Sequence, residues 1–229
     1  MATPTLPRKR NPDFPTREGV GARERRAAEV MRRLLGYYPE TRTALDWKTP
    51  FELLIATILS AQCTDVRVNK VTPALFARFP DPPAMALATL DELEELVKTT
   101  GFFRSKAKSL LGTATIIMRD FGGEVPRTMP ELLTLMGVAR KTANCVLGTA
   151  FGLKVGVVVD THVGRIARRM GFSREMDPVK VERDLMKAFE QDLWVKVSHS
   201  MIDHGRATCT ARTARCKGCL LADICPQRV

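Results

Sequence analysis

The chain has 229 residues, 45% of them hydrophobic, which is enough to bury one sizeable core or two modest ones. Lys and Arg total 36 against 25 Asp and Glu, so the formal net charge is +11 and favours a polyanionic partner such as nucleic acid. The sequence has no apolar run that would span a bilayer and no signal-peptide core, which argues against a membrane or exported protein. We expect a monomer in the cytoplasm, or in the nucleus or mitochondrion of a eukaryote, with its six cysteines reduced or metal-bound.

The N-terminal segment is basic and rich in proline. Residues 1–22 carry four prolines and the run Arg8-Lys9-Arg10, a composition that cannot build a core. We expect a disordered tail there, with a DNA-contacting arm or a targeting signal as the alternatives. Apolar residues then recur at helical spacing from Ala27 to Leu35, which predicts a helix over 23–38.

The middle of the chain reads as a series of helices. Residues 50–63 are apolar on nearly every side and predict a largely buried helix, with Pro50 in its first turn. The β-rich run 155–159 has no partner strand in the sequence, so we expect an extended crossing segment and an all-α protein. Further helix signals, several of them after a capping Asp, Thr or Ser, lie at 65–71, from Thr72 onward, and at 91–98, 105–121 and 129–135.

Residues 132–160 predict a helix, a tight hairpin, a second helix and an extended segment. Gly137 permits the turn, and the second helix starts at once at Arg140 with backbone N–H groups that suit a phosphate. Lys141 follows in the first turn, where the helix dipole and Arg140 both disfavour an ammonium. Taken alone, a helix-Gly-helix pattern more often marks a surface helix start with two solvated basic residues.

Four cysteines lie close together near the C-terminus. Cys209, Cys216, Cys219 and Cys225 have the spacing C-x6-C-x2-C-x5-C, and such density implies a metal. The spacing has only one close pair and leaves an iron–sulfur cluster and a zinc site open as alternatives, with disulfides disfavoured. Cys63 and Cys145 are expected as small buried residues on helix faces.

The hairpin region resembles the endonuclease III family of DNA glycosylases, in which LPGVGRKTA is followed by VDTH. Residues 135–143 and 159–162 correspond to these two motifs, and matching segments continue in the family's order from about Leu53 to Cys225. Two positions depart from the pattern. Met136 stands where the family has the hairpin proline, and Ala139 where it has the second glycine.

The resemblance implies how the chain binds duplex DNA. Residues 60–65 look like the family's SAQ-x-TD turn and residues 101–107 like its glycine loop. Gln62 and Phe102, the latter in place of leucine, would fill the gap left by a nucleotide swung out of the stack. Phe102 and Phe103 also fit core positions. The hairpin residues implied to hold a phosphate are Gly137, Val138, Ala139 and Arg140.

The resemblance also implies one 4Fe-4S cluster bound by the four C-terminal cysteines, downstream of an HGR-x-x-C segment at 204–209. Arg212 and Arg215 lie between the first two ligands, where a loop fixed by the cluster would present them to DNA phosphates. The alternative is simple structural stapling of the segment with incidental charges.

The implied architecture has two helical domains with the active site between them. One domain spans 46–153 and carries the hairpin; the other combines 23–45 with 154–229 and carries the cluster. Lys141 would come from the first and Asp160 from the second. Asp160 also precedes a predicted helix over 161–170 and fits its N-cap, a role compatible with catalysis; His162 is expected to be structural.

The implied activity is that of a bifunctional DNA glycosylase and AP lyase of base excision repair. Lys141 would attack C1′ of the flipped nucleotide, expel an oxidised pyrimidine through a Schiff base, and cleave the strand 3′ to the site by β-elimination. The partner would be double-stranded DNA with damaged pyrimidines or abasic sites. The alternatives are a noncatalytic damage-binding protein and an adenine-excising mismatch glycosylase, which in the family lacks this lysine and has a further C-terminal domain.

Overall fold

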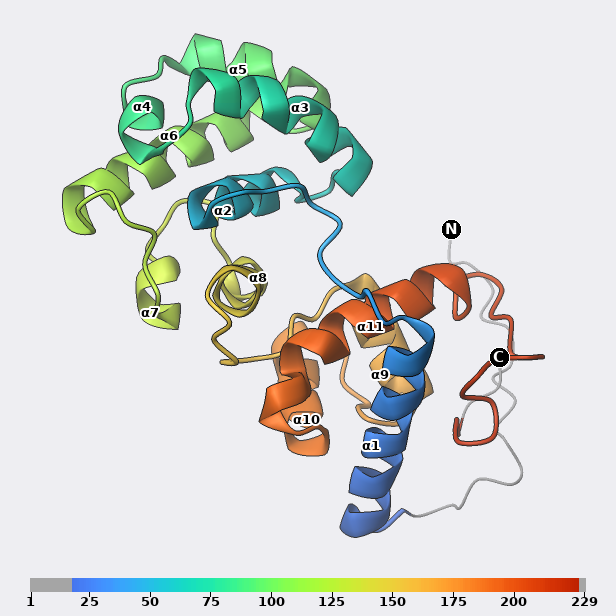
Figure 1. Cartoon of the computed structure of the whole chain (residues 1–229). Coiled ribbons are helices and arrows are strands. Elements are labelled where there is room, and N and C mark those ends of the chain that lie inside the picture. The colour runs from blue at the N-terminus through green and yellow to red at the C-terminus, as the bar shows by residue number, and fades with distance from the viewer. Residues whose placement is uncertain (1–17, 227–229) are drawn as a thin grey trace. The chain divides into compact units, whose positions relative to one another are not determined.

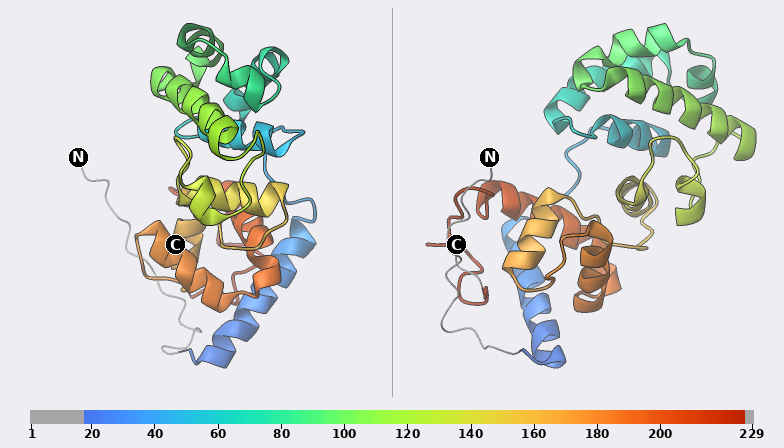
Figure 2. Two further views of the ribbon diagram at one scale, coloured as in Figure 1. Left: turned by 90° about the vertical axis from the view of Figure 1, so that its left-hand side faces the viewer. Right: turned by 180° about the vertical axis from the view of Figure 1, so that it is seen from behind.

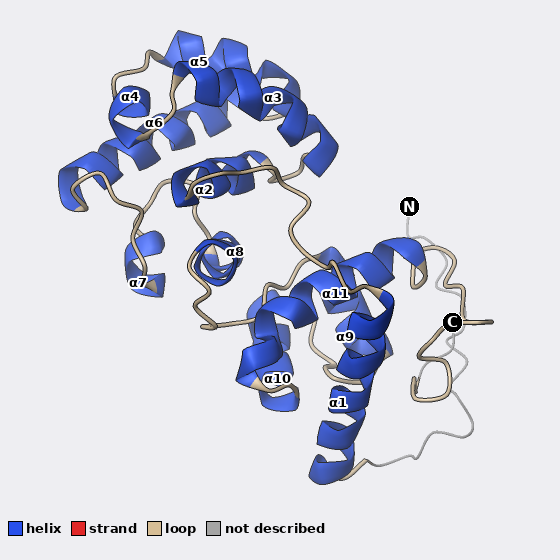
Figure 3. Cartoon of the chain, in the orientation of Figure 1, coloured by secondary structure: helices blue, strands red, loops and turns tan. Residues whose placement is uncertain are grey.

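A computed structural model describes residues 18–226 of the chain. These residues are mostly helical, and the only β-pairing among them is an isolated bridge between Cys209 and Ala214 (Figure 3). The prediction of an all-α protein is therefore confirmed. In the described part, no helix combines the length and apolar character needed to cross a membrane.

The chain divides into two compact units (Figure 1). One unit is Thr43–Val155, which contains the hairpin and is here called the hairpin unit. The other combines Met1–Arg42 with Gly156–Val229, contains the four C-terminal cysteines and is called the cysteine unit. The boundaries expected from the sequence were 45/46 and 153/154. Each unit has a hydrophobic core of its own.

The hairpin unit is built around α2 (Pro50–Leu59). Thr49 caps this helix by accepting a hydrogen bond from the Glu52 N–H, and nearly every α2 side chain is buried. Helices α4 and α5 pack on α6, and α2 packs on α8 (Figures 1 and 2). The remaining elements of the unit are α3 (Asp65–Arg78), α4 (Pro82–Ala86), α5 (Leu90–Val97), the 3-10 helix η1 (Lys98–Thr100), α6 (Phe103–Asp120), α7 (Met129–Leu132) and α8 (Arg140–Ala150).

Three helices of this unit differ from their predictions. Helix α7 ends at Leu132 and not at residue 135, because the N–H groups of Thr134 and Leu135 bond to carbonyls three residues back in turns. Helix α2 ends at Leu59 instead of continuing to residue 63, because the following turn brings Gln62 to a φ of 52°. Cys63 consequently lies in this turn and not on a helix face. The two helix signals around Thr72 form one continuous helix, α3, which passes through Pro73.

The cysteine unit contains α1 (Val20–Tyr37), α9 (Thr161–Arg169), α10 (Pro178–Ala188), the 3-10 helix η2 (Gln191–Leu193) and α11 (Trp194–Ala207). Helices α9 and α10 lie beside one another, and α1 packs on α11 and α10. Helices α4, α10 and α11 were not among the predicted ones. An Asp-Pro pair begins both α4 and α10, and in each the aspartate caps the helix.

The expected N-terminal tail requires a correction at its end. Residues 1–17 lie outside the described part, but α1 begins at Val20, so residues 20–22 are helical. Glu18 forms two hydrogen bonds with the Arg26 guanidinium, at 2.7 and 2.6 Å, and this pair is largely buried. Charge pairing across the helix start therefore extends the ordered chain beyond the point where apolar periodicity begins.

The run 155–159 forms neither helix nor strand. Val157 and Val159 are buried in the core of the cysteine unit. The Val158 N–H donates to Ser198 Oγ at 2.9 Å, so a side chain of α11 satisfies backbone that has no neighbouring strand. This segment leads directly into Asp160.

Candidate functional site

The hairpin between α7 and α8 packs closely against α6. Its turn residue Gly137 has a φ of +77°, a left-handed value that other residues rarely adopt. A Cβ at this position would lie 2.9 Å from both Cβ and Oγ of Ser109 in α6. Both the backbone conformation and the available space therefore require glycine here.

The structure accommodates the two departures from the endonuclease III pattern. Thr113 Oγ1 in α6 donates to the Met136 carbonyl at 2.7 Å, and the Met136 side chain lies over Gly112, where a Cβ would be only 2.0 Å from Met136 Sδ. Ala139 has a φ of −98° and a ψ of 171°, an extended conformation that needs no glycine. Contacts with α6 thus hold the turn without the proline.

Helix α8 begins with an uncapped first turn. Its N-cap residue Ala139 makes no side-chain hydrogen bond, so the N-cap side chain does not cap the start of the helix. Gly137 and Ala139 are exposed, Arg140 is half-buried, and the Val138 side chain is buried in the core, so Val138 presents no side chain to a partner. Lys141 is exposed in this first turn. The arrangement suits an anion at the start of α8, beside the exposed amine of Lys141.

Asp160 caps α9 in the cysteine unit, as predicted. Its Oδ1 accepts hydrogen bonds from the backbone N–H groups of His162 and Val163, both at 2.8 Å. Its Oδ2 lies 3.2 Å from His162 Nδ1. The carboxylate is half-buried and held at both oxygens, so it is fixed in orientation.

Gln62 and Phe102 share a strained backbone conformation. Among residues 18–226 they are the only non-glycine residues with positive φ, at 52° and 48°. Phe102 is 67% exposed and Gln62 is exposed as well, whereas Phe103 packs against the core. Because both side chains are exposed, they make no buried contacts that would offset the backbone strain. Backbone strain of this kind is found most often at functional sites.

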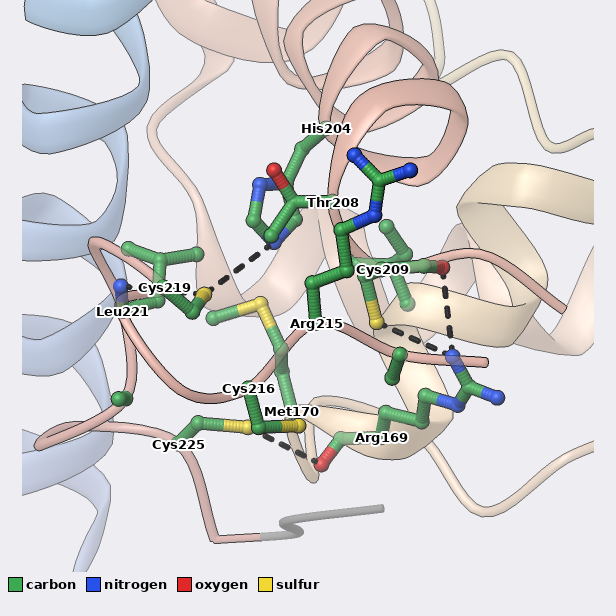
Figure 4. A pocket seen from close by; sticks show the side chains of 13 residues that line it. Arg169, Met170, His204, Thr208, Cys209, Arg215, Cys216, Cys219, Leu221 and Cys225 are labelled. Atoms are coloured by element: carbon green, nitrogen blue, oxygen red, sulfur yellow. Dashed lines mark hydrogen bonds between the residues drawn. The ribbon is translucent and has the colours of Figure 1, made fainter. Parts of the chain in front are cut away.

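The four C-terminal cysteines line one pocket of the cysteine unit (Figure 4). All four are free thiols and are half-buried. The rest of the lining is mostly apolar, and its polar members are Arg169 of α9, His204 of α11, Thr208 and Arg215. The pocket therefore gathers sulfur donors from Cys209, Cys216, Cys219 and Cys225.

Two of these sulfurs accept hydrogen bonds from N–H groups. Arg169 Nη1 donates to Cys209 Sγ at 3.2 Å, and the Leu221 N–H donates to Cys219 Sγ at 3.4 Å. Burial raises the pKa of the Cys219 thiol. Burial also lowers the pKa of His204 to about 4, so its imidazole is neutral at physiological pH. The His204 Nε2 atom lies 3.8 Å from Cys219 Sγ. Between residues 18 and 226, no three His, Cys, Asp or Glu side chains are arranged to hold a single metal ion. Four sulfurs in one largely apolar pocket, two of them accepting N–H hydrogen bonds, suit a thiolate-bound cluster.

The loop that carries Arg212 and Arg215 is held at several points. The Arg169 guanidinium donates to the carbonyls of Thr210 at 2.7 Å and Ala211 at 3.2 Å. The Arg215 N–H donates to the Thr208 carbonyl at 3.0 Å. Arg212 and Arg215 are themselves exposed. The fold thus fixes the backbone beneath two exposed cations.

Comparison with known proteins bears on this arrangement. Residues 55–191 match the sequence profile of the HhH-GPD superfamily of base excision DNA repair proteins, which is more than half of the chain. The chain belongs to this superfamily. The matched span includes the hairpin, Lys141 and Asp160, whereas the four cysteines lie beyond it.

Relatives place the chain beside the endonuclease III members of the HhH-GPD superfamily. It is 53% identical to endonuclease III of Synechocystis sp. over 90% of this chain and 94% of that protein. It is 41% identical to endonuclease III of Escherichia coli strain K12 over 86% of this chain and 93% of that protein. A solved structure of a trapped endonuclease III–DNA covalent intermediate matches with a TM-score of 0.83 and 38% identity, covering 88% of this chain and 95% of that one. The predicted family is confirmed.

Two site-supporting residues of this HhH-GPD protein were not predicted. Arg169 holds the cysteine loop, and Lys106 in α6 is buried with two carbonyl partners. The only sequence signal for Arg169 is the Arg-Arg pair that ends α9, which is usual for the C-terminal turn of a helix.

Proposed function

We propose that this chain acts on double-stranded DNA containing oxidised pyrimidines or abasic sites, as a bifunctional DNA glycosylase and AP lyase of base excision repair. The observation that carries the proposal is the exposed Lys141 in the uncapped first turn of α8, directly after the hairpin. Its HhH-GPD membership and its 53% identity to an endonuclease III support the same activity. We place this activity in the cytoplasm, on the nucleoid, with the protein acting as a monomer.

The chemistry follows from a lysine amine. Lys141 Nζ, in its neutral form, attacks C1′ of the flipped nucleotide; the C1′–N bond breaks and its electron pair leaves with the base. Loss of the Nζ proton and opening of the sugar give a Schiff base between Nζ and C1′. This imine acidifies the C2′ proton, and removal of that proton expels the 3′ phosphate by β-elimination. That an endonuclease III 38% identical to this chain has been trapped covalently on DNA supports a covalent route.

Asp160 is proposed to assist this sequence. Because α9 amides hold Oδ1 and the His162 ring stands beside Oδ2, the carboxylate keeps a fixed orientation. A carboxylate so held stabilises positive charge that develops on the sugar and accepts protons during the transfers. Its capping role and its proposed catalytic role use the same geometry.

The proposed DNA contacts come from the hairpin and from the two strained loops. The uncapped start of α8 binds a backbone phosphate through main-chain N–H groups at Gly137, Ala139 and Arg140. Gln62 and Phe102 enter the stack and fill the space of the flipped nucleotide, which recovers part of the few kcal/mol that unstacking costs.

The four cysteines are proposed to bind one 4Fe-4S cluster. When bound, the cluster supplies a rigid crosslink between the two ends of the loop. The chain itself adds the Arg169 guanidinium, which holds the loop carbonyls, and the exposed Arg212 and Arg215, which contact phosphates.

A nicking assay tests the proposed activity. The protein is incubated with a duplex that carries one oxidised pyrimidine, and the products are separated with and without subsequent alkali. A bifunctional enzyme gives the nicked strand without alkali, because β-elimination follows base release at the same lysine. A nick that appears only after alkali would indicate a glycosylase without lyase activity. Binding without release of the base would indicate a noncatalytic damage-binding protein.

Removal of the cluster is expected to change both stability and DNA affinity. Anaerobically purified protein should be yellow-brown with about four irons per chain. Crosslinking a loop of roughly 15 residues contributes about 3 kcal/mol, so the apoprotein should melt about 6–12 °C lower. Its log–log dependence of duplex affinity on salt should also flatten by about one unit for each of Arg212 and Arg215 that loses its phosphate. Stoichiometric zinc without iron would contradict the cluster assignment, and an unchanged slope would remove the two arginines from the interface.

A further inference from the structure

A lysine is buried in the hairpin unit at a point that the proposed chemistry does not use. Lys106 in α6 is only 6% exposed. Its Nζ donates to the Leu59 carbonyl at 2.8 Å and to the Thr100 carbonyl at 2.7 Å. A buried ammonium is costly unless it is well bonded, so its retention here at two main-chain acceptors needs a reason.

The two acceptors come from different segments of the unit. Leu59 is the last residue of α2, and Thr100 is the last residue of η1. Gln62 follows the first acceptor after three residues and Phe102 follows the second after two. A single ammonium therefore connects the bases of the two loops that carry the only positive-φ non-glycine residues in the described part of the chain.

In each loop, hydrogen bonds hold the backbone where the loop begins, and the side chain of Gln62 or Phe102 is exposed. The Lys106 backbone N–H donates to the Phe102 carbonyl at 3.0 Å, so Lys106 holds this loop through both main chain and side chain. On the other loop, Ser60 Oγ donates to the Thr57 carbonyl at 2.8 Å. The side chains of Gln62 and Phe102 remain exposed. Anchored bases with exposed tips are suited to inserting side chains at a set spacing.

We propose that Lys106 is a positioning residue that fixes the two loops relative to each other, so that Gln62 and Phe102 enter the DNA stack together. This inference rests on the proposed function. Loops that are already ordered lose less conformational freedom when they insert, so more of the binding energy is available for unstacking. Replacing the ammonium should therefore impair extrusion of the nucleotide from a duplex more than it impairs the chemistry at C1′.

The test compares Lys106→Met with Lys108→Met. Lys108 lies on the same helix and is exposed, and its substitution removes the same charge. The first probe is a duplex with a tetrahydrofuran abasic analogue beside 2-aminopurine, whose fluorescence rises when the base unstacks. The second is borohydride trapping on a single-stranded abasic oligonucleotide, which needs no unstacking from a duplex.

Lys106→Met should lose most of the fluorescence rise and should excise a paired lesion about 10- to 100-fold more slowly. Its trapping on single-stranded DNA should match that of Lys108→Met. Lys106→Arg, which keeps the charge and the donors, should recover part of the fluorescence rise.

The outcomes separate this inference from the proposed function. A folded Lys106→Met whose duplex and single-strand reactions match those of Lys108→Met, or fall by equal factors, would overturn the positioning role. Wild-type protein that fails to trap on either abasic DNA would overturn the proposed function instead. If Lys106→Met does not fold, Lys106→Gln replaces it, because its single donor nitrogen sits one bond closer to the backbone and cannot reach both carbonyls. A folded Lys106→Gln with an undiminished fluorescence rise would equally overturn the positioning role.

Discussion

Lys141→Gln is expected to release a lesion base from duplex DNA at least about 10³-fold more slowly than the wild type, because the glutamine amide cannot form a Schiff base. Duplex affinity should stay within about threefold, since the start of α8 and the hairpin are intact and one phosphate contact is the most that is lost. Single-turnover rates with a paired oxidised pyrimidine measure the first quantity, and gel-shift titration measures the second.

The matched control for this substitution is Lys70→Gln. Lys70 is exposed on α3 of the same unit, and replacing it by glutamine removes the same charge. Lys141 is exposed, so the melting temperatures of both variants should match that of the wild type. Retention of base release by a folded Lys141→Gln would move the nucleophile to another residue.

Asp160→Asn is expected to bind duplex DNA normally and to turn over about 10²- to 10⁴-fold more slowly. Asparagine keeps the Oδ1 acceptor for the His162 and Val163 N–H groups, and it is as good an N-cap as aspartate. The substitution therefore removes the charge while it leaves the helix start in place. A thermal melt and single-turnover kinetics measured on the same preparation separate the two effects.

The informative control is Asp160→Ala, which removes the cap as well. Its loss of stability should be about 1 kcal/mol, the usual contribution of a cap. If Asp160→Asn retains wild-type turnover, the residue is a helix cap and nothing more. If Asp160→Asn melts as low as Asp160→Ala, its lost activity reports on folding and not on catalysis.

Local sequence signals predicted much of the fold and of the site. The cap at Asp160 and the start of α8 at Arg140 depend on residues within one helical turn, and both were found. The spacing of the four cysteines likewise predicted that they share a site, and they line one pocket. Motifs of this kind are readable because their partners lie a few residues away along the chain.

Contacts between distant segments could not be read in this way. The Leu59 carbonyl that Lys106 binds and the Thr210 carbonyl that Arg169 binds lie 47 and 41 residues from their donors along the chain. The helix expected to reach residue 63 ends at Leu59, whose carbonyl accepts a hydrogen bond from Lys106 Nζ of α6, and a local apolar pattern does not reveal such a contact. The hairpin lacks its proline and second glycine, but Thr113 and Gly112 of α6 supply the support, and neither is near the hairpin in sequence.

The central claim is that the amine of Lys141 bonds covalently to C1′ during turnover. The direct test is to reduce the reaction of wild-type protein and an abasic duplex with borohydride, digest the adduct, and locate the modified residue by mass spectrometry. The account predicts one crosslinked peptide with the sugar remnant on Lys141, and no adduct with Lys141→Gln. An adduct that maps to any other residue, or that forms undiminished with folded Lys141→Gln, would contradict it.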